Sequence, residues 1–129
     1  MSESPIQLTM YEGSVARFQL GAHPTPAHFK THFTDAVENM FEADRKFSLI
    51  IDSSQVNAIS LEITGTMVKW LKTNRERLGK HLVSSSVIVT SNLVKNVFDM
   101  VFRFYSPIAP LKIVQCEREA WDFVEANEV

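Results

Sequence analysis

The chain has 129 residues, of which 45% are hydrophobic and 22% charged, and its formal net charge is −2. These values are typical of a single globular domain covering residues 1–129, and they argue against a disordered chain. They also argue against a nucleic-acid binder, because such proteins usually carry a basic excess that neutralises phosphates.

The chain shows no signal that directs it to a membrane or out of the cell. No apolar run approaches the roughly 20 residues that a transmembrane helix needs. The first residues lack the basic and apolar regions of a signal peptide, and the single Cys116 cannot form an internal disulfide. We therefore expect a cytoplasmic protein.

Two short extended stretches, residues 6–11 and 14–20, open the chain and predict an antiparallel hairpin with its turn at residues 12–13. Thr25 and Pro26 then suit the N-cap and first position of a helix that should run to about Ala43. Its apolar residues recur at spacings of three and four. They are Phe29, Phe33, Ala36, Val37, Met40 and Phe41.

Short apolar runs alternate with helical patterns in the rest of the chain. Residues 47–51 and 84–90 are typical of strands that are buried on both sides, as in parallel sheets. A helix should begin near Ser60, direct Ile63, Met67, Trp70, Leu71 and Leu78 inward, and stop at Gly79. Residues 92–105 predict a helix, residues 111–114 a strand, and residues 117–127 a last helix.

The order β-β-α-β-α-β-α-β-α predicts an α/β fold. Its sheet should be mostly parallel, with about five strands, an N-terminal antiparallel hairpin and about four helices.

The C-terminal third carries a family resemblance. Val87-Ile88-Val89 leads into an apolar helix, then Pro107, a strand at residues 111–114, and the helical segment 119–124, which reads EAWDFV. This pattern resembles the SpoIIAA-like domains related to STAS modules. The resemblance implies a sheet wound sequentially from β-α units, as also in lipid-carrying CRAL-TRIO domains. It further implies a non-enzymatic protein, such as an anti-sigma-factor antagonist, a transporter appendage or a stand-alone bacterial domain.

The resemblance also points to a phosphorylation site that this chain lacks in its usual form. In the antagonists, the serine of an Asp-Ser-x-Gly turn is phosphorylated at the start of the helix after the central strand. The matching stretch here is Ile59-Ser60-Leu61-Glu62, and Leu61 stands at the phosphoserine position. Ser60, an expected N-cap, would be a weak substitute.

The helix at residues 92–105 has more apolar surface than one packing face can hide. Neighbouring helices could cover the excess, or a second face could serve a dimer, a protein partner or a hydrophobic ligand. We expect this surface to consist of Val94, Phe98, Phe102 and Tyr105.

Polar residues follow the buried strands, where ligands of open α/β sheets bind. Asp52, Ser53, Ser60 and Ser91 are candidates for an anion site or a phospho-switch loop. Serines in these places are equally ordinary helix caps, and the loops have no glycine-rich turn.

Two charged patterns have a simple alternative interpretation. His28, His32 and Asp35 share a helix face and could bind a metal, but a solvated face explains them better, so we expect no metal and no cofactor. The basic residues between Lys69 and Lys80 also suit a solvated face, although an anionic membrane or the acidic last helix of a second copy could contact them.

No motif identifies a catalytic residue, so our leading hypothesis is a non-enzymatic, regulatory binding module. It would act through a homodimer or a protein partner. The second hypothesis is a carrier of a lipid or other hydrophobic molecule, and the third is an enzyme or phospho-switch around Asp52 and Ser60.

Overall fold

The structure, a computed structural model, describes residues 6–11 and 14–127. Strands β2 to β5 run parallel to one another, and β1 runs antiparallel to β2. The sheet order is β1-β2-β3-β4-β5, with bounds β1 (Ile6–Tyr11), β2 (Val15–Leu20), β3 (Phe47–Asp52), β4 (Leu82–Ile88) and β5 (Leu111–Val114). The predicted α/β class with a largely parallel sheet is confirmed, while the turn at residues 12–13 lies outside the described residues.

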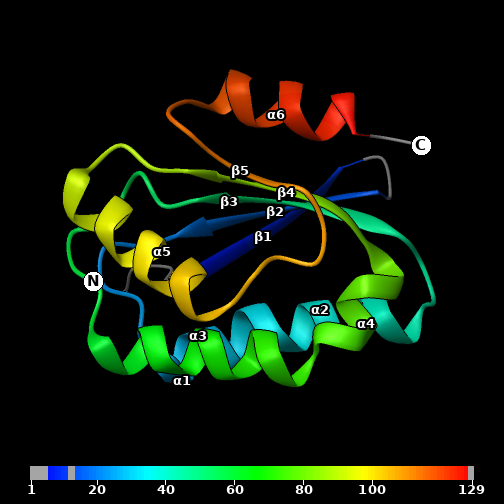
Figure 1. The fold of residues 1–129 in the computed structure, drawn as a ribbon, viewed down its shortest axis with the longest axis horizontal. Helices are drawn as coiled ribbons and strands as arrows, with labels where there is room; N and C mark the ends of the chain where they lie inside the picture. The colour runs from blue at the N-terminus through cyan, green and yellow to red at the C-terminus, as the bar shows by residue number, and fades with distance from the viewer. Residues whose placement is uncertain (1–5, 12–13, 128–129) are drawn as a thin grey trace.

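The helices lie on both faces of this sheet (Figure 1). Their bounds are α1 (Pro26–His28), the π-helical segment η1 (Phe29–Thr34), α2 (Asp35–Glu42), α3 (Leu61–Thr73), α4 (Arg75–His81), α5 (Asn92–Phe104) and α6 (Glu117–Ala126). Helix α6 covers one face and the other helices cover the opposite face. None of the helices in the described ranges is long and apolar enough to cross a membrane.

The first helical segment starts where its cap residues predict. The Thr25 hydroxyl accepts a hydrogen bond from the backbone N–H of His28, and Pro26 occupies the first helical position. The segment continues through η1 and α2 to Glu42, one residue before the expected end.

The predicted stop at Gly79 is wrong, because Gly79 lies inside α4. The helix is interrupted earlier, at Asn74, whose buried side chain donates to the carbonyl of Trp70. Gly79 is instead a point of close approach: a Cβ there would lie 3.0 Å from Cδ1 of Ile108. A glycine can therefore mark a contact made by a distant loop as well as a helix end.

Each central strand divides its side chains between two cores. Phe18, Leu49 and Val87 face the layer of α1 to α5. Ile50 and Ile88 face α6, where they pack with Val15, Val114, Ala120 and Val124. This two-sided burial explains why the strands read as continuous apolar runs.

Candidate functional site

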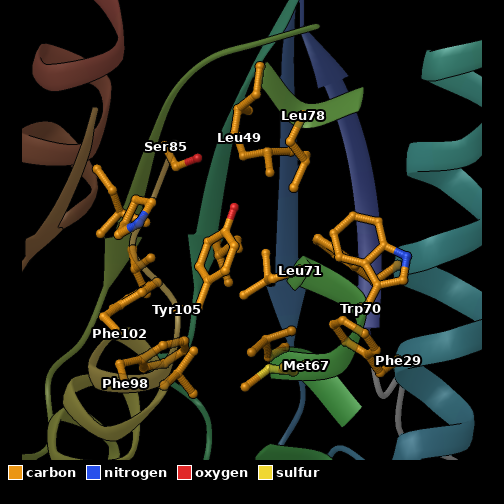
Figure 2. A pocket seen from close by; sticks show the side chains of 18 of the residues that line it. Phe29, Leu49, Met67, Trp70, Leu71, Leu78, Ser85, Phe98, Phe102 and Tyr105 are labelled. Carbon is orange, nitrogen blue, oxygen red and sulfur yellow. The ribbon is translucent and has the colours of Figure 1, made fainter. Parts of the chain in front are cut away.

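An apolar cavity of about 100 Å³ lies between the sheet and the helical layer of α3, α4 and α5 (Figure 2). Its floor is the face of the sheet that carries Leu49, Ile51, Ser85 and Val87. Helix α5 contributes Phe98, Val101 and Phe102, and Tyr105 lines the cavity directly after the helix ends. Helices α3 and α4 contribute Ile63, Met67, Trp70, Leu71 and Leu78, the five residues that the sequence predicts to point inward.

Aromatic rings form one wall of the cavity. Phe29 and Phe33 stack with their centroids 4.9 Å apart, and Trp70 meets Phe33 edge to face at 5.3 Å. Such pairs add to the stability that buried area alone supplies. These ring contacts therefore fix the positions of the aromatic side chains on this wall of the cavity.

Two hydroxyl groups break the hydrocarbon lining. Ser85 points its hydroxyl into the cavity from β4, and Tyr105 lies across from it at the end of α5 (Figure 2). Burial raises the pKa of Tyr105 above its usual 10.0, and the nearby positive charge of Arg75 partly offsets this rise. The guanidinium carbon of Arg75 lies 5.4 Å from the centre of the Tyr105 ring. This end of the cavity can therefore form hydrogen bonds with a polar group of a ligand, whereas the rest of the lining offers only apolar contacts.

No family model and no curated protein matches this chain. A solved structure does match it: an uncharacterised protein of the DUF3478 family, with a SpoIIAA-like fold, from Shewanella loihica PV-4. The TM-score is 0.65, and the match covers 92% of this chain and 90% of that chain. This chain has a SpoIIAA-like fold. The sequence identity is 16%, so the likeness extends to the fold alone.

The SpoIIAA-like fold buries the surface that we expected on the helix at residues 92–105. Val94, Phe98 and Tyr105 are each no more than 5% exposed, and Phe102 is partly buried against the same core. As an exposed surface for a dimer or a protein partner, this prediction is wrong, because the four residues face the sheet. Three of them, Phe98, Phe102 and Tyr105, line the cavity, so a role in binding a hydrophobic ligand stays a prediction.

The exposed apolar residues of α5 are different ones. Leu93, Met100 and Phe104 lie on the outer side of the helix. Their spacing was visible in the sequence, but both sides of α5 are apolar. Periodicity therefore could not decide which side faces the sheet.

The four polar candidates have structural roles in the SpoIIAA-like fold. The Ser53 hydroxyl donates to the carbonyl of Ile88 at 2.6 Å, and this serine is buried. Ser60 and Ser91 are helix caps, which accept from the backbone N–H groups of Ile63 and Val94. Each cap serves its own helix, α3 or α5, so a shared anion site or phospho-switch at these serines stays a prediction.

The fourth candidate, Asp52, belongs to a charge cluster that the sequence analysis missed. Arg17 donates to Asp52 at 2.7 Å and to both carboxylate oxygens of Glu117, also at 2.7 Å. The indole N–H of Trp121 donates to Glu117 as well. The hydrogen bond from Arg17 is the main reason why the pKa of Glu117 lies below its usual 4.5. The signal in the sequence was Arg17 itself, a charged residue within a buried strand, which needs a partner.

The histidine pair is not part of a larger ligand set. The rings of His28 and His32 lie 6.3 Å apart. Within residues 6–11 and 14–127, no three His, Cys, Asp or Glu residues are grouped so that they could hold a metal ion.

Proposed function

We propose that this SpoIIAA-like chain is a non-enzymatic module that binds a small, mainly apolar molecule in the cavity between the sheet and α3 to α5. The observation that carries the proposal is the lining itself. Its walls are hydrocarbon and aromatic, and hydroxyl groups stand at Ser85 and Tyr105. Such a lining suits binding sites in general, where apolar walls supply affinity and a few polar groups fix orientation.

The volume limits the size of the ligand. The cavity of about 100 Å³ is somewhat smaller than the cavities of about 150 Å³ that bind benzene in proteins. Sites for drug-sized molecules are larger, at roughly 300 to 1,000 Å³. The ligand that fits without movement of the helices is therefore a short apolar chain or a small ring, and a long acyl chain does not fit.

Protein interiors are usually closely packed, so a lined space of about 100 Å³ beside the core is unusual. A ligand of matching shape would cover this apolar lining and stabilise the folded state, which supports a binding role for the cavity.

The two hydroxyl groups indicate the chemistry of the ligand's polar end. A hydroxyl can both donate and accept a hydrogen bond, so Ser85 and Tyr105 suit an alcohol, a carbonyl or a carboxylic acid. The positive charge of Arg75 beside Tyr105 favours the acid among these. The ligand class that we propose is a short-chain amphiphile with one oxygen-containing end.

Thermal unfolding with added ligands tests this proposal. The probes are benzene and a series of short unbranched alcohols and carboxylic acids. We expect the unfolding midpoint to rise with ligand concentration, because a ligand that binds only the folded state stabilises it by mass action. Native mass spectrometry of the gently purified protein should show a small bound mass.

Cavity-filling variants supply the control. Leu71→Phe and Ala109→Leu add volume inside the lining, whereas Leu93→Phe makes a comparable change on the exposed side of α5. We expect Leu93→Phe to keep the ligand response and at least one filling variant to lose it. The proposal fails if no probe shifts the wild type, or if both folded filling variants respond as the wild type does.

A further inference from the structure

The outer sides of α3 and α5 form an exposed apolar groove of about 490 Å³. Leu61 and Val68 line it from α3, and Met100 and Phe104 line it from α5. The exposed fractions of Leu61 and Phe104 are 79% and 61%. Single exposed apolar side chains are common, whereas a set that lines one groove on two adjoining helices is a candidate interaction surface.

The groove and the cavity lie on different sides of the same helices. On α5, Val94, Phe98 and Val101 are buried, while Leu93, Met100 and Phe104 point outward. The members of the inner set are four and three residues apart, and those of the outer set are seven and four residues apart, so each set lies on one side of the helix. Helix α5 therefore has two apolar faces, and packing in the protein core explains only the inner one.

Basic residues border the groove. Lys69 and Lys72 line it from α3. Between residues 61 and 81, helices α3 and α4 carry five basic and two acidic residues. Helix α6, on the opposite face of the sheet, carries four acidic residues and one basic residue (Figure 1). The groove is thus bordered by two lysines, while the acidic α6 lies on the opposite face of the sheet.

We propose that the groove of α3 and α5 docks the protein on an anionic phospholipid membrane. Leu61, Met100 and Phe104 enter the boundary between headgroups and acyl chains, while Lys69 and Lys72 contact the phosphates. Apolar side chains beside lysines are the combination that interfacial helices use on membrane surfaces. The acidic α6 faces away from the membrane in this orientation.

The charges argue against a twofold contact between two grooves. Such a contact would place Lys69 and Lys72 of both copies in one interface, and like charges oppose it. The acidic α6 of a second copy could meet these lysines, but among the described residues α6 exposes no large apolar side chain that could fill the groove. An anionic membrane surface attracts all of these lysines. The docking proposal is separate from the cavity ligand, because none of the groove residues Leu61, Met100 and Phe104 lines the cavity.

Vesicle flotation with the full chain tests the proposal. One vesicle population contains phosphatidylcholine alone, and the other contains phosphatidylcholine with phosphatidylglycerol. We expect binding to the anionic vesicles that weakens with added salt, and much weaker binding to the neutral ones. Phe104→Ser should lower the partition coefficient about tenfold or more, because it removes an inserted aromatic ring.

A matched pair of charge reversals identifies the membrane-facing side. Lys69→Glu, at the groove, should reduce binding to anionic vesicles about tenfold. Lys112→Glu makes the same change in net charge on the exposed part of β5, and it should have a much smaller effect. Leu71→Phe, which fills the cavity, should leave vesicle binding unchanged, so the two proposals can fail separately.

Two results would overturn the docking proposal. One is an absence of binding to anionic vesicles. The other is equal binding by the wild type and by folded Phe104→Ser and Lys69→Glu variants. Light scattering with size-exclusion chromatography tests whether a second copy of the chain occupies the groove. If the wild type self-associates, Phe104→Ser abolishes this association, and no vesicle binding is seen, the groove binds a second copy.

Discussion

Arg17 and Glu117 are 100 residues apart in the chain, yet they form a bidentate ion pair across the interface between the sheet and α6. Nε and Nη2 of Arg17 each donate to a different carboxylate oxygen at 2.7 Å. The same Nη2 also reaches Asp52, so one guanidinium joins β2, β3 and the start of α6. The cluster is sensitive to the loss of Arg17, because the Asp52 side chain is only 10% exposed and would keep a buried, unpaired charge.

Arg17→Met should destabilise the protein by about 3 kcal/mol, because it leaves the buried carboxylate of Asp52 without its cation. Urea unfolding measures the change. Adding Asp52→Asn to Arg17→Met should recover part of the loss, since it removes the unpaired charge and retains the oxygen that accepts from Ser54. A double variant that is no more stable than Arg17→Met would contradict this account.

Glu117 should make stability depend on pH in the acidic range. Its pKa in the folded protein is lowered from 4.5, mainly by the hydrogen bond from Arg17. The ion pair therefore adds stability above pH 4.5, and this stability is lost as the pH falls toward the lowered pKa. Urea midpoints across this range should fall less steeply for Glu117→Gln than for the wild type. Glu125→Gln, on the exposed side of α6, should follow the wild type.

Two phenylalanines of α5 should respond very differently to truncation. Phe98→Ala should cost about 3 kcal/mol or more, because Phe98 is 5% exposed and its loss enlarges the cavity. Phe104→Ala should change the free energy of unfolding by about 0.5 kcal/mol or less, because Phe104 is 61% exposed. Equal costs in chemical denaturation would mean that the inner and outer faces of α5 are assigned wrongly.

Ser60 offers a test of a structural against a signalling role. Ser60→Ala should destabilise the protein by about 1 kcal/mol, because α3 loses its N-cap acceptor. Ser60→Asp should retain nearly full stability, since aspartate caps as well as serine does. Thermal melts of both variants measure this difference. If Ser60→Asp lost as much as Ser60→Ala, the cap would not be the role of this side chain.

Most of the secondary structure could be predicted from local pattern. The strand at residues 111–114 has the expected bounds, and the other strands and most helix ends lie within about two residues of them. Short apolar runs, Thr25-Pro26 and the serine caps all act within a few residues of chain, so their signals are local. Gly79 is the exception, because its reason is contact with Ile108 in a distant loop.

The candidate site was only partly accessible to the same reasoning. The sequence indicates Phe98, Phe102 and Tyr105, because residues 92–105 are too apolar for one packing face, and these residues do line the cavity. Their burial could not be foreseen, since the outer set with Leu93 and Phe104 has an equally good helical spacing. The polar end at Ser85 has no distinct signal in the sequence, because Ser85 is one of three consecutive serines, Ser84 to Ser86, and the pattern does not show which of them faces the cavity.

The order of amino acids alone specifies the strands, the helices, the caps and the two-sided burial of the sheet, because these depend on neighbours within a few residues. The side of α5 that packs on the sheet, the partner of Arg17 and the cavity beside Ser85 depend on contacts between segments far apart in the chain. Such contacts exist only after the sheet has its register and the helices are packed. For that reason only the folded chain shows the cavity, the groove and the ion pair that joins α6 to the sheet.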